Sequence, residues 1–144
     1  MTTEFLQFKS RLRWVALPLV LVSTLSLGSA ARAQGLMTPL SEPAQQSGVS
    51  GGSQPSACGN LPAAPTQTLQ VTETFASVDI TLQGEGALTL LITGPGGFSE
   101  CRTTDRFNAG QINAPGLLNQ GVYSIYVGNE SSAQTPYTLS IRQN

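Results

Sequence analysis

Apolar and polar residues alternate along most of the second half of the chain, with the period of two that is typical of half-buried β-strands. Within 75–83, for example, every second residue from Val78 onward is a large aliphatic. Four such faces are expected, formed by Val78, Ile80 and Leu82; Leu88, Leu90 and Ile92; Tyr123, Ile125 and Val127; and Tyr137, Leu139 and Ile141. No segment after position 66 has a helical period, so the pattern predicts an all-β domain.

Turn-forming residues separate these segments and set their bounds. The pattern predicts strands over 66–72, 75–83, 87–94, 98–104, 121–127 and 136–141. Residues 104–119 are expected to be irregular, with Ala114-Pro115-Gly116 as a breaker. The last two strands either pair directly or lie in different sheets, which local pattern does not decide. A small antiparallel β-sandwich or jelly-roll is the expected closure.

The start of the chain has the pattern of a signal peptide. Basic residues precede the apolar run Trp14–Leu27, and Ala31-Arg32-Ala33 has the A-x-A form that signal peptidase cuts. We therefore expect residues 1–33 to be removed after Ala33 and the protein to be periplasmic or secreted. A retained membrane anchor is the alternative, but the run carries Pro18 and is shorter than the roughly 20 residues that a spanning helix needs. No stable membrane insertion is expected after cleavage.

Residues 34–57 differ from the rest in composition. Sixteen of these 24 positions are Gly, Ser, Gln or Pro, and no apolar period is sustained. Such a segment predicts a flexible leader. The β-domain is then expected to span 58–144, which is enough for one small domain.

The net charge of the chain after cleavage restricts the kinds of partner that it can bind. The segment 34–144 has no lysine or histidine, and its three arginines face seven acidic residues, a formal charge of −4. Nucleic acids and anionic membranes are bound through clustered Lys and Arg. A nucleic-acid partner is therefore excluded.

Cys58 and Cys101 are the two cysteines of the chain. In a chain sent to an oxidising compartment, an even number of cysteines indicates a disulfide. We expect these two to be bonded.

The strand patterns carry a family resemblance. The stretch "NQGVYSIYVGNESSAQTPYTLSI" is similar to the closing segment of the bacterial pre-peptidase C-terminal domain, roughly G-x-Y-x-(apolar)-x-V, a polar loop and Y-x-L-x-(apolar). Upstream, "VDITLQGEGALTLLITGP" resembles the early strand pair of that family. The resemblance covers about residues 66–142.

This resemblance implies a small secreted β-sandwich with a binding or secretion-related role, often attached to an extracellular peptidase. Some relatives bind calcium through acidic loops, and calcium needs only oxygen ligands. The candidate ligands here are Asp79, Glu85, Glu100, Asp105 and Asn108. They are not clustered in sequence, and this sequence holds no peptidase before the domain. Apart from calcium, no cofactor is expected.

Catalysis has little support in the sequence. Hydrolases with an activated Ser or Cys usually need a histidine base, and the chain has none. A carboxylate pair drawn from Glu85, Glu100 and Asp105 leaves only a small glycoside hydrolase as an enzymatic alternative. Tyr126 lies on the face opposite Tyr123, where an exposed ring can stack on a sugar or peptide.

Together these observations predict an exported, non-catalytic binding module for a protein, glycan or peptidase partner at the cell envelope or outside the cell. The main alternative is a structural envelope protein that assembles with copies of itself.

Overall fold

The computed structural model describes residues 35–105, 107–108 and 110–144. Over these ranges the chain is almost entirely β-structure, with a single short 3₁₀ turn, η1. The elements are β1 (Gly35–Met37), β2 (Ala44–Val49), β3 (Gln54–Ser56), β4 (Gly59–Leu61), β5 (Gln67–Gly84), β6 (Leu88–Thr93), η1 (Pro95–Gly97), β7 (Ser99–Thr103), β8 (Gln111–Asn129) and β9 (Pro136–Gln143). The expected all-β class is confirmed.

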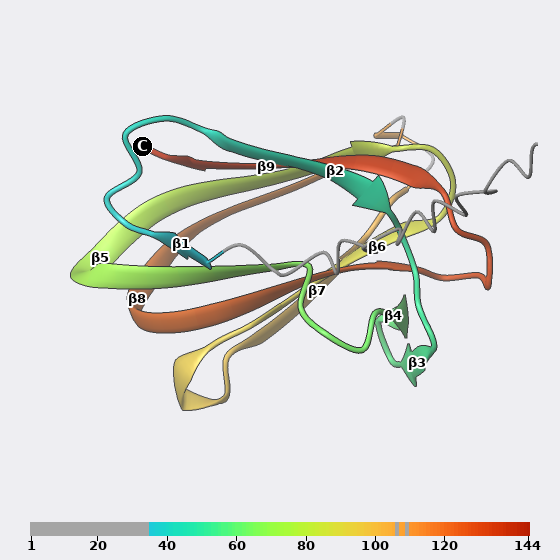
Figure 1. Cartoon of the computed structure of the whole chain (residues 1–144), viewed down its shortest axis with the longest axis horizontal. Coiled ribbons are helices and arrows are strands. Elements are labelled where there is room, and N and C mark those ends of the chain that lie inside the picture. Colours follow the sequence, from blue (N-terminus) through green and yellow to red (C-terminus); the bar gives the residue numbers. More distant parts are fainter. Residues whose placement is uncertain (1–34, 106, 109) are drawn as a thin grey trace, which may run out of the picture. The chain divides into compact units, whose positions relative to one another are not determined.

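Two long strands organise the fold. β5 and β8 run antiparallel to each other along nearly their whole length, and both turn back on themselves at the same place (Figure 1). The bend lies where the pairing shifts between Val71 and Phe75, with Gly121 and Asn119 as the partners on β8. Extra residues on one strand increase its local twist and bend it, as in a β-bulge. One continuous sheet therefore folds into two layers.

The first layer has the order β2-β9-β5-β8 and uses the C-terminal half of β5 and the N-terminal half of β8. The second layer uses the other halves: β1 lies parallel to the start of β5, and β6 and β7 follow β8 on its far side. The β3–β4 hairpin joins the second layer where Asn60 pairs with Asn129. The antiparallel sandwich expected from the sequence is thus present as one folded sheet.

The core fills the space between the layers. All four apolar faces predicted from alternation are buried in it, and Leu82, Leu88, Leu90 and Ile125 are completely inaccessible to solvent. Burying a side chain of this size stabilises a fold by about 1.5–3 kcal/mol relative to exposure. Leu91 points to the other face of β6 and is half-buried.

The segment expected to be a flexible leader is instead built into the sheet. Residues 35–37 pair with β5, and β2 pairs with β9 over its full length, from Ala44 to Val49. Its small, polar composition suits an edge strand at the rim of the core: at Gly48 the Tyr137 hydroxyl lies 2.7 Å from where a Cβ would be. The domain therefore begins by residue 35 and not at 58. The expected signal peptide, 1–33, lies outside the described residues.

Two further predictions need correction. The expected strands 66–72 and 75–83 are the two halves of the single strand β5. Residues 111–119, expected to be irregular, form the first half of β8. Pro115 is tolerated there because this half of β8 pairs only with β5, and an edge strand can lack one outward N–H.

The last two strands do not form a hairpin. β9 pairs with β2 and with the second half of β5, whereas the C-terminal half of β8 pairs with β6 and with the first half of β5. The polar loop after β8 therefore carries the chain from one layer to the other.

Candidate functional site

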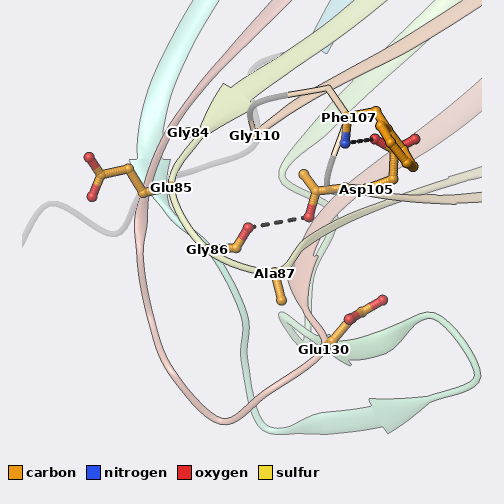
Figure 2. Close-up of a pocket in the computed structure, with 9 residues that line it drawn as sticks. Gly84, Glu85, Gly86, Ala87, Asp105, Phe107, Gly110 and Glu130 are labelled. Carbon is orange, nitrogen blue, oxygen red and sulfur yellow. Dashed lines mark hydrogen bonds between the residues drawn. The ribbon is translucent and has the colours of Figure 1, made fainter.

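A hollow of about 720 Å³ lies where the β5–β6 turn meets the loop between β7 and β8 (Figure 2). Its lining residues are Gly84, Glu85, Gly86, Ala87, Thr104, Asp105, Phe107, Gly110 and Glu130. The three segments that contribute to it are the turn 84–87, the loop 104–110 and the first residue after β8.

Backbone hydrogen bonds join these segments to one another. Gly84 N donates to Gly110 O at 3.1 Å, and Glu130 N donates to Ala87 O at 2.9 Å. The Thr104 hydroxyl donates to Gly86 O at 3.2 Å, which Figure 2 shows as a dashed line. Hydrogen bonds between the segments therefore hold the walls of the hollow together. They fix the backbone from which the lining side chains project.

Asp105 organises the loop that carries Phe107. Its Oδ1 accepts hydrogen bonds from the backbone N–H of Phe107 at 2.8 Å and from that of Asn108 at 2.7 Å, and its Oδ2 accepts one from Asn108 Nδ2 at 2.9 Å. This is the way Asp commonly closes a turn on its own backbone. The turn leaves Phe107 93% exposed, so a large apolar ring stands in solvent beside the hollow.

Three carboxylates lie around the hollow: those of Glu85, Asp105 and Glu130. Figure 2 shows the Glu85 side chain pointing away from the other two. In the part of the chain that the structure describes, no three Asp, Glu, His or Cys side chains are grouped so that they could hold a metal ion.

The five candidate calcium ligands do not converge. The structure brings Asp105 and Asn108 together and places Glu85 on the same hollow as Asp105. Asp79 lies on β5 and forms an ion pair with Arg142 at 2.9 Å, while Glu100 on β7 pairs with Arg102. Hydrogen bonds from Asn144 and Arg142 lower the pKa of Asp79 below its ordinary value of 3.8.

The same dispersal applies to the carboxylates considered for glycoside hydrolysis. Glu85 and Asp105 line the hollow, but Glu100 is on β7, paired with its arginine neighbour. The two cysteines are bonded to each other, with Cα atoms 5.8 Å apart. Neither thiol is therefore a nucleophile.

Tyr126 lies on the outer face of the second layer, as predicted, and its side chain is half-buried. In the sheet register it is opposite Leu91, which is in turn opposite Cys101. The disulfide thus crosses the same outer face and fixes the β3–β4 hairpin over the end of β8. There Cys58 and Leu61 are buried outside the main core, only 4% and 6% exposed.

Sequence reasoning missed Phe107 as a site residue, and it gave Glu130 no role. The signal that could have indicated Phe107 is the order Asp105-x-Phe107-Asn108 between two strands, because an Asp–Asn turn presents the residue between them to solvent.

A solved structure of similar fold agrees with this description. No family model matches the chain. A structure of the pre-peptidase C-terminal domain of a collagenase from Bacillus anthracis matches it with a TM-score of 0.52 at 16% identity, covering 77% of this chain and 97% of that domain. PliG of Aeromonas hydrophila, a periplasmic lysozyme inhibitor of g-type lysozyme, gives a TM-score of 0.40 at 18% identity, covering 78% and 98%. The chain has the fold of a pre-peptidase C-terminal domain, as the sequence resemblance implied.

One sequence relative is close enough to define a family. The uncharacterized protein Synpcc7942_2126 of Synechococcus elongatus is 32% identical over 102 residues, which cover 67% of this chain and 73% of that protein. Within the residues described, no helix is long and apolar enough to cross a membrane. The chain belongs to the same protein family as the Synechococcus elongatus protein, and it carries a pre-peptidase C-terminal-like β-sandwich closed by the Cys58–Cys101 disulfide.

Proposed function

We propose that the chain is an exported, non-catalytic binding module that recognises a partner protein, an envelope glycan or a peptidase. The observation that carries the proposal is Phe107, exposed at 93% on a turn that Asp105 closes. Aromatic side chains dominate the binding energy of many interfaces when they enter a pocket of the partner. A residue whose backbone is already fixed by its turn loses less conformational freedom on binding.

The disulfide supports the export part of the proposal. Disulfides form and persist in oxidising compartments, and this one holds a hairpin on the domain surface. Together with the predicted signal peptide over 1–33, it favours the periplasm or the exterior as the place of action.

The non-catalytic part rests on the residues available. Without histidine, and with both cysteines bonded, the acid–base groups of the hollow are the carboxylates Glu85, Asp105 and Glu130. Asp105 already accepts three hydrogen bonds from its own turn. Its chemistry is that of a structural carboxylate.

The test measures retention of the labelled, exported chain by the envelope and secreted fractions of cells that produce it. If Phe107 enters a partner, Phe107→Ala should weaken binding by roughly 10- to 150-fold, since burying such a side chain contributes about 1.5–3 kcal/mol. Phe75→Ala is the matched control, because Phe75 is also exposed, at 58%, but lies at the bend of β5.

The nature of the partner is read from the same assay. Protease treatment of the fraction should abolish retention by a protein, and glycan-degrading enzymes should abolish retention by a glycan. Equal loss with Phe75→Ala, or full binding by Phe107→Ala, would show that the Phe107 turn is not the contact.

A further inference from the structure

Among the described residues the folded sheet has five free edges, and four of them are blocked. β7 carries the charged residues Glu100 and Arg102 and the disulfide. The N-terminal half of β8 contains Pro115, and Arg102 Nη1 donates to its edge carbonyl at Asn113, 3.0 Å away. β1 and β3 are each three residues long, and β3 contains Pro55. Charges, proline, covering side chains and shortness are the usual ways in which proteins prevent edge pairing.

β2 lacks all of these protections. Its sequence, AQQSGV, has six residues with no charge and no proline. It pairs with β9 on one side, and no residue in the described ranges pairs with its other side. A strand of this kind is a template for a further strand.

The backbone groups at this free edge can be identified. Ser50 N donates to Thr135 O at 2.9 Å, so Ser50 faces β9. Because N–H and C=O directions alternate along an antiparallel strand, the groups of Gln45, Ser47 and Val49 face outward. The pairing of Val49 with Pro136 agrees with this assignment, since a proline has no N–H to offer β2.

We propose that two copies of the chain pair through β2, antiparallel and centred on Ser47, so that a single sheet runs through both. With Ser47 on the two-fold axis, Gln45 of one copy lies opposite Val49 of the second. Every outward N–H and C=O of one β2 then meets a complementary group on the other. A two-fold interface of this kind is self-complementary and closed, so assembly stops at the dimer.

A second observation selects another copy as the occupant rather than an unrelated strand. Gln46 Oε1 is buried at the rim of the core and has no hydrogen-bond partner within the described chain. Pairing about Ser47 places Gln46 opposite Gly48 of the second copy. There the Tyr137 hydroxyl occupies the space that a side chain at 48 would fill, 2.7 Å from the ideal Cβ position. The Tyr137 hydroxyl oxygen has a hydrogen bond with Thr66 in its own chain, and its proton can be donated to the unpaired amide oxygen of the second copy.

The absence of charge on β2 also favours pairing of identical strands, because like charges directly opposite each other destabilise a sheet. The contact is small compared with stable interfaces, which bury about 1,600 Å² in total. The dimer is therefore expected to dissociate in the micromolar range or above.

Sedimentation velocity of the exported chain, from about 1 µM to 1 mM, tests the proposal. The mass should rise towards twice that of the monomer. Ser47→Pro should remain monomeric throughout, and it should still fold because the N–H it loses points to solvent in the single chain. Gln83→Lys, in the same row of the sheet but two strands inward on β5, is the control and should dimerise as the unmodified chain does.

Substitutions of opposite charge at Ser47 test whether the two-fold axis of the dimer passes through this residue. Ser47→Lys and Ser47→Asp should each be monomeric, because two like charges would then lie side by side, whereas an equimolar mixture of the two should dimerise. Circular dichroism and the melting temperature confirm that each variant is folded. A monomer at every concentration overturns the proposal, as does a dimer that survives Ser47→Lys, or a mixture that does not pair. Strand addition by an unrelated protein would leave the purified chain monomeric and is among these contrary outcomes.

Discussion

Gln143 Nε2 donates a hydrogen bond to Glu73 Oε1 over 3.0 Å, and this bond joins the last strand to the bend of β5. The other carboxylate oxygen of Glu73 accepts a hydrogen bond from the Thr38 hydroxyl, just after β1. Gln143 Oε1 in turn accepts from Leu40 N at 2.8 Å. A single carboxylate thus connects the two ends of the described chain at the corner where the sheet folds.

This hydrogen-bond network makes the stability of the fold depend on pH. Hydrogen bonds from Thr38, from Gln143 and from the backbone of Glu73 itself, with a smaller contribution from Thr72, lower the pKa of Glu73 from 4.5 to about 2. A carboxyl whose pKa is lower in the folded state stabilises the fold above its unfolded pKa, and that contribution is lost as pH falls from about 4.5 towards 2. Melting temperatures at pH 7, 4 and 2.5 should therefore fall less steeply for Glu73→Gln than for the unmodified chain. Glu73→Gln should also melt lower at pH 7. Parallel curves would show that Glu73 is not the group responsible.

The core positions should be costly to truncate. Leu82 and Ile125 are fully buried between the layers, so Leu82→Ala or Ile125→Ala is expected to lower the free energy of unfolding by about 2–5 kcal/mol. Urea denaturation measures this change. Leu117→Ala is the matched control, because Leu117 is 68% exposed, and it should change stability by less than about 0.5 kcal/mol.

Removal of the disulfide should be equally costly. The bond joins residues separated by 43 positions, and the chain-entropy model gives roughly 4 kcal/mol for a loop of this size. The Cys58→Ser, Cys101→Ser double variant is expected to lose about this much in urea denaturation. Thiol labelling of the unreduced, denatured chain should find no reactive cysteine. A labelled thiol, or an unchanged unfolding midpoint, would contradict the prediction.

Alanine variants of two glycines distinguish the cost of backbone strain from the cost of crowding, and one of the two glycines lines the hollow. Gly96 has φ of +67° with no atom within 4 Å of an added Cβ, so Gly96→Ala should cost about 1 kcal/mol from conformation alone. Gly110 has φ of +79°, and a Cβ there would lie 2.0 Å from Gly84 O, the carbonyl oxygen of the residue to which it is bonded. Gly110→Ala should cost at least 1–2 kcal/mol more in the same unfolding assay. Equal losses of unfolding free energy in the two variants would mean that the backbone at Gly110 and Gly84 can move apart without an energetic cost.

Calcium binding stays a prediction that thermal unfolding can test. Because the five sequence candidates are spread over β5, β7 and two loops, we expect no shift in melting temperature between saturating calcium and chelator. Calcium at 100 times its dissociation constant would add roughly 2.7 kcal/mol, or more than about 10 °C for a domain of this size. If such a shift appears, Glu130→Gln should abolish it when the hollow is the site, and Asp79→Asn should not.

The sequence predicted the faces of the strands better than their partners. The four apolar rows were readable because side chains alternate strictly along a strand, whatever its neighbours are. Pattern could not show that 66–72 and 75–83 are one strand, since the bend depends on a bulge that forms only against β8. The pattern also could not show that β2 is a strand, because its Gln, Ser and Gly residues are those of a linker. The reason for a glycine at position 48 is the Tyr137 hydroxyl, which only the structure places there.

The site was less predictable than the fold. Tyr126 was assigned to the correct face, but its exposure depends on neighbours in the sheet. Phe107 carries no periodic signal, because it belongs to a turn closed by Asp105. The acidic candidates are scattered along the sequence, and the ion pairs that Asp79 and Glu100 make within the sheet are not visible in the pattern.

The pairing of β2 with β9 has a consequence for biogenesis. Gln46 and Leu139 are neighbours in the sheet although more than ninety residues separate them in the chain. The first layer therefore cannot close until the ribosome has released β9, and contacts of such long range form slowly. Pairing of β2 is thus expected to be among the last steps of folding, after both long strands have been made.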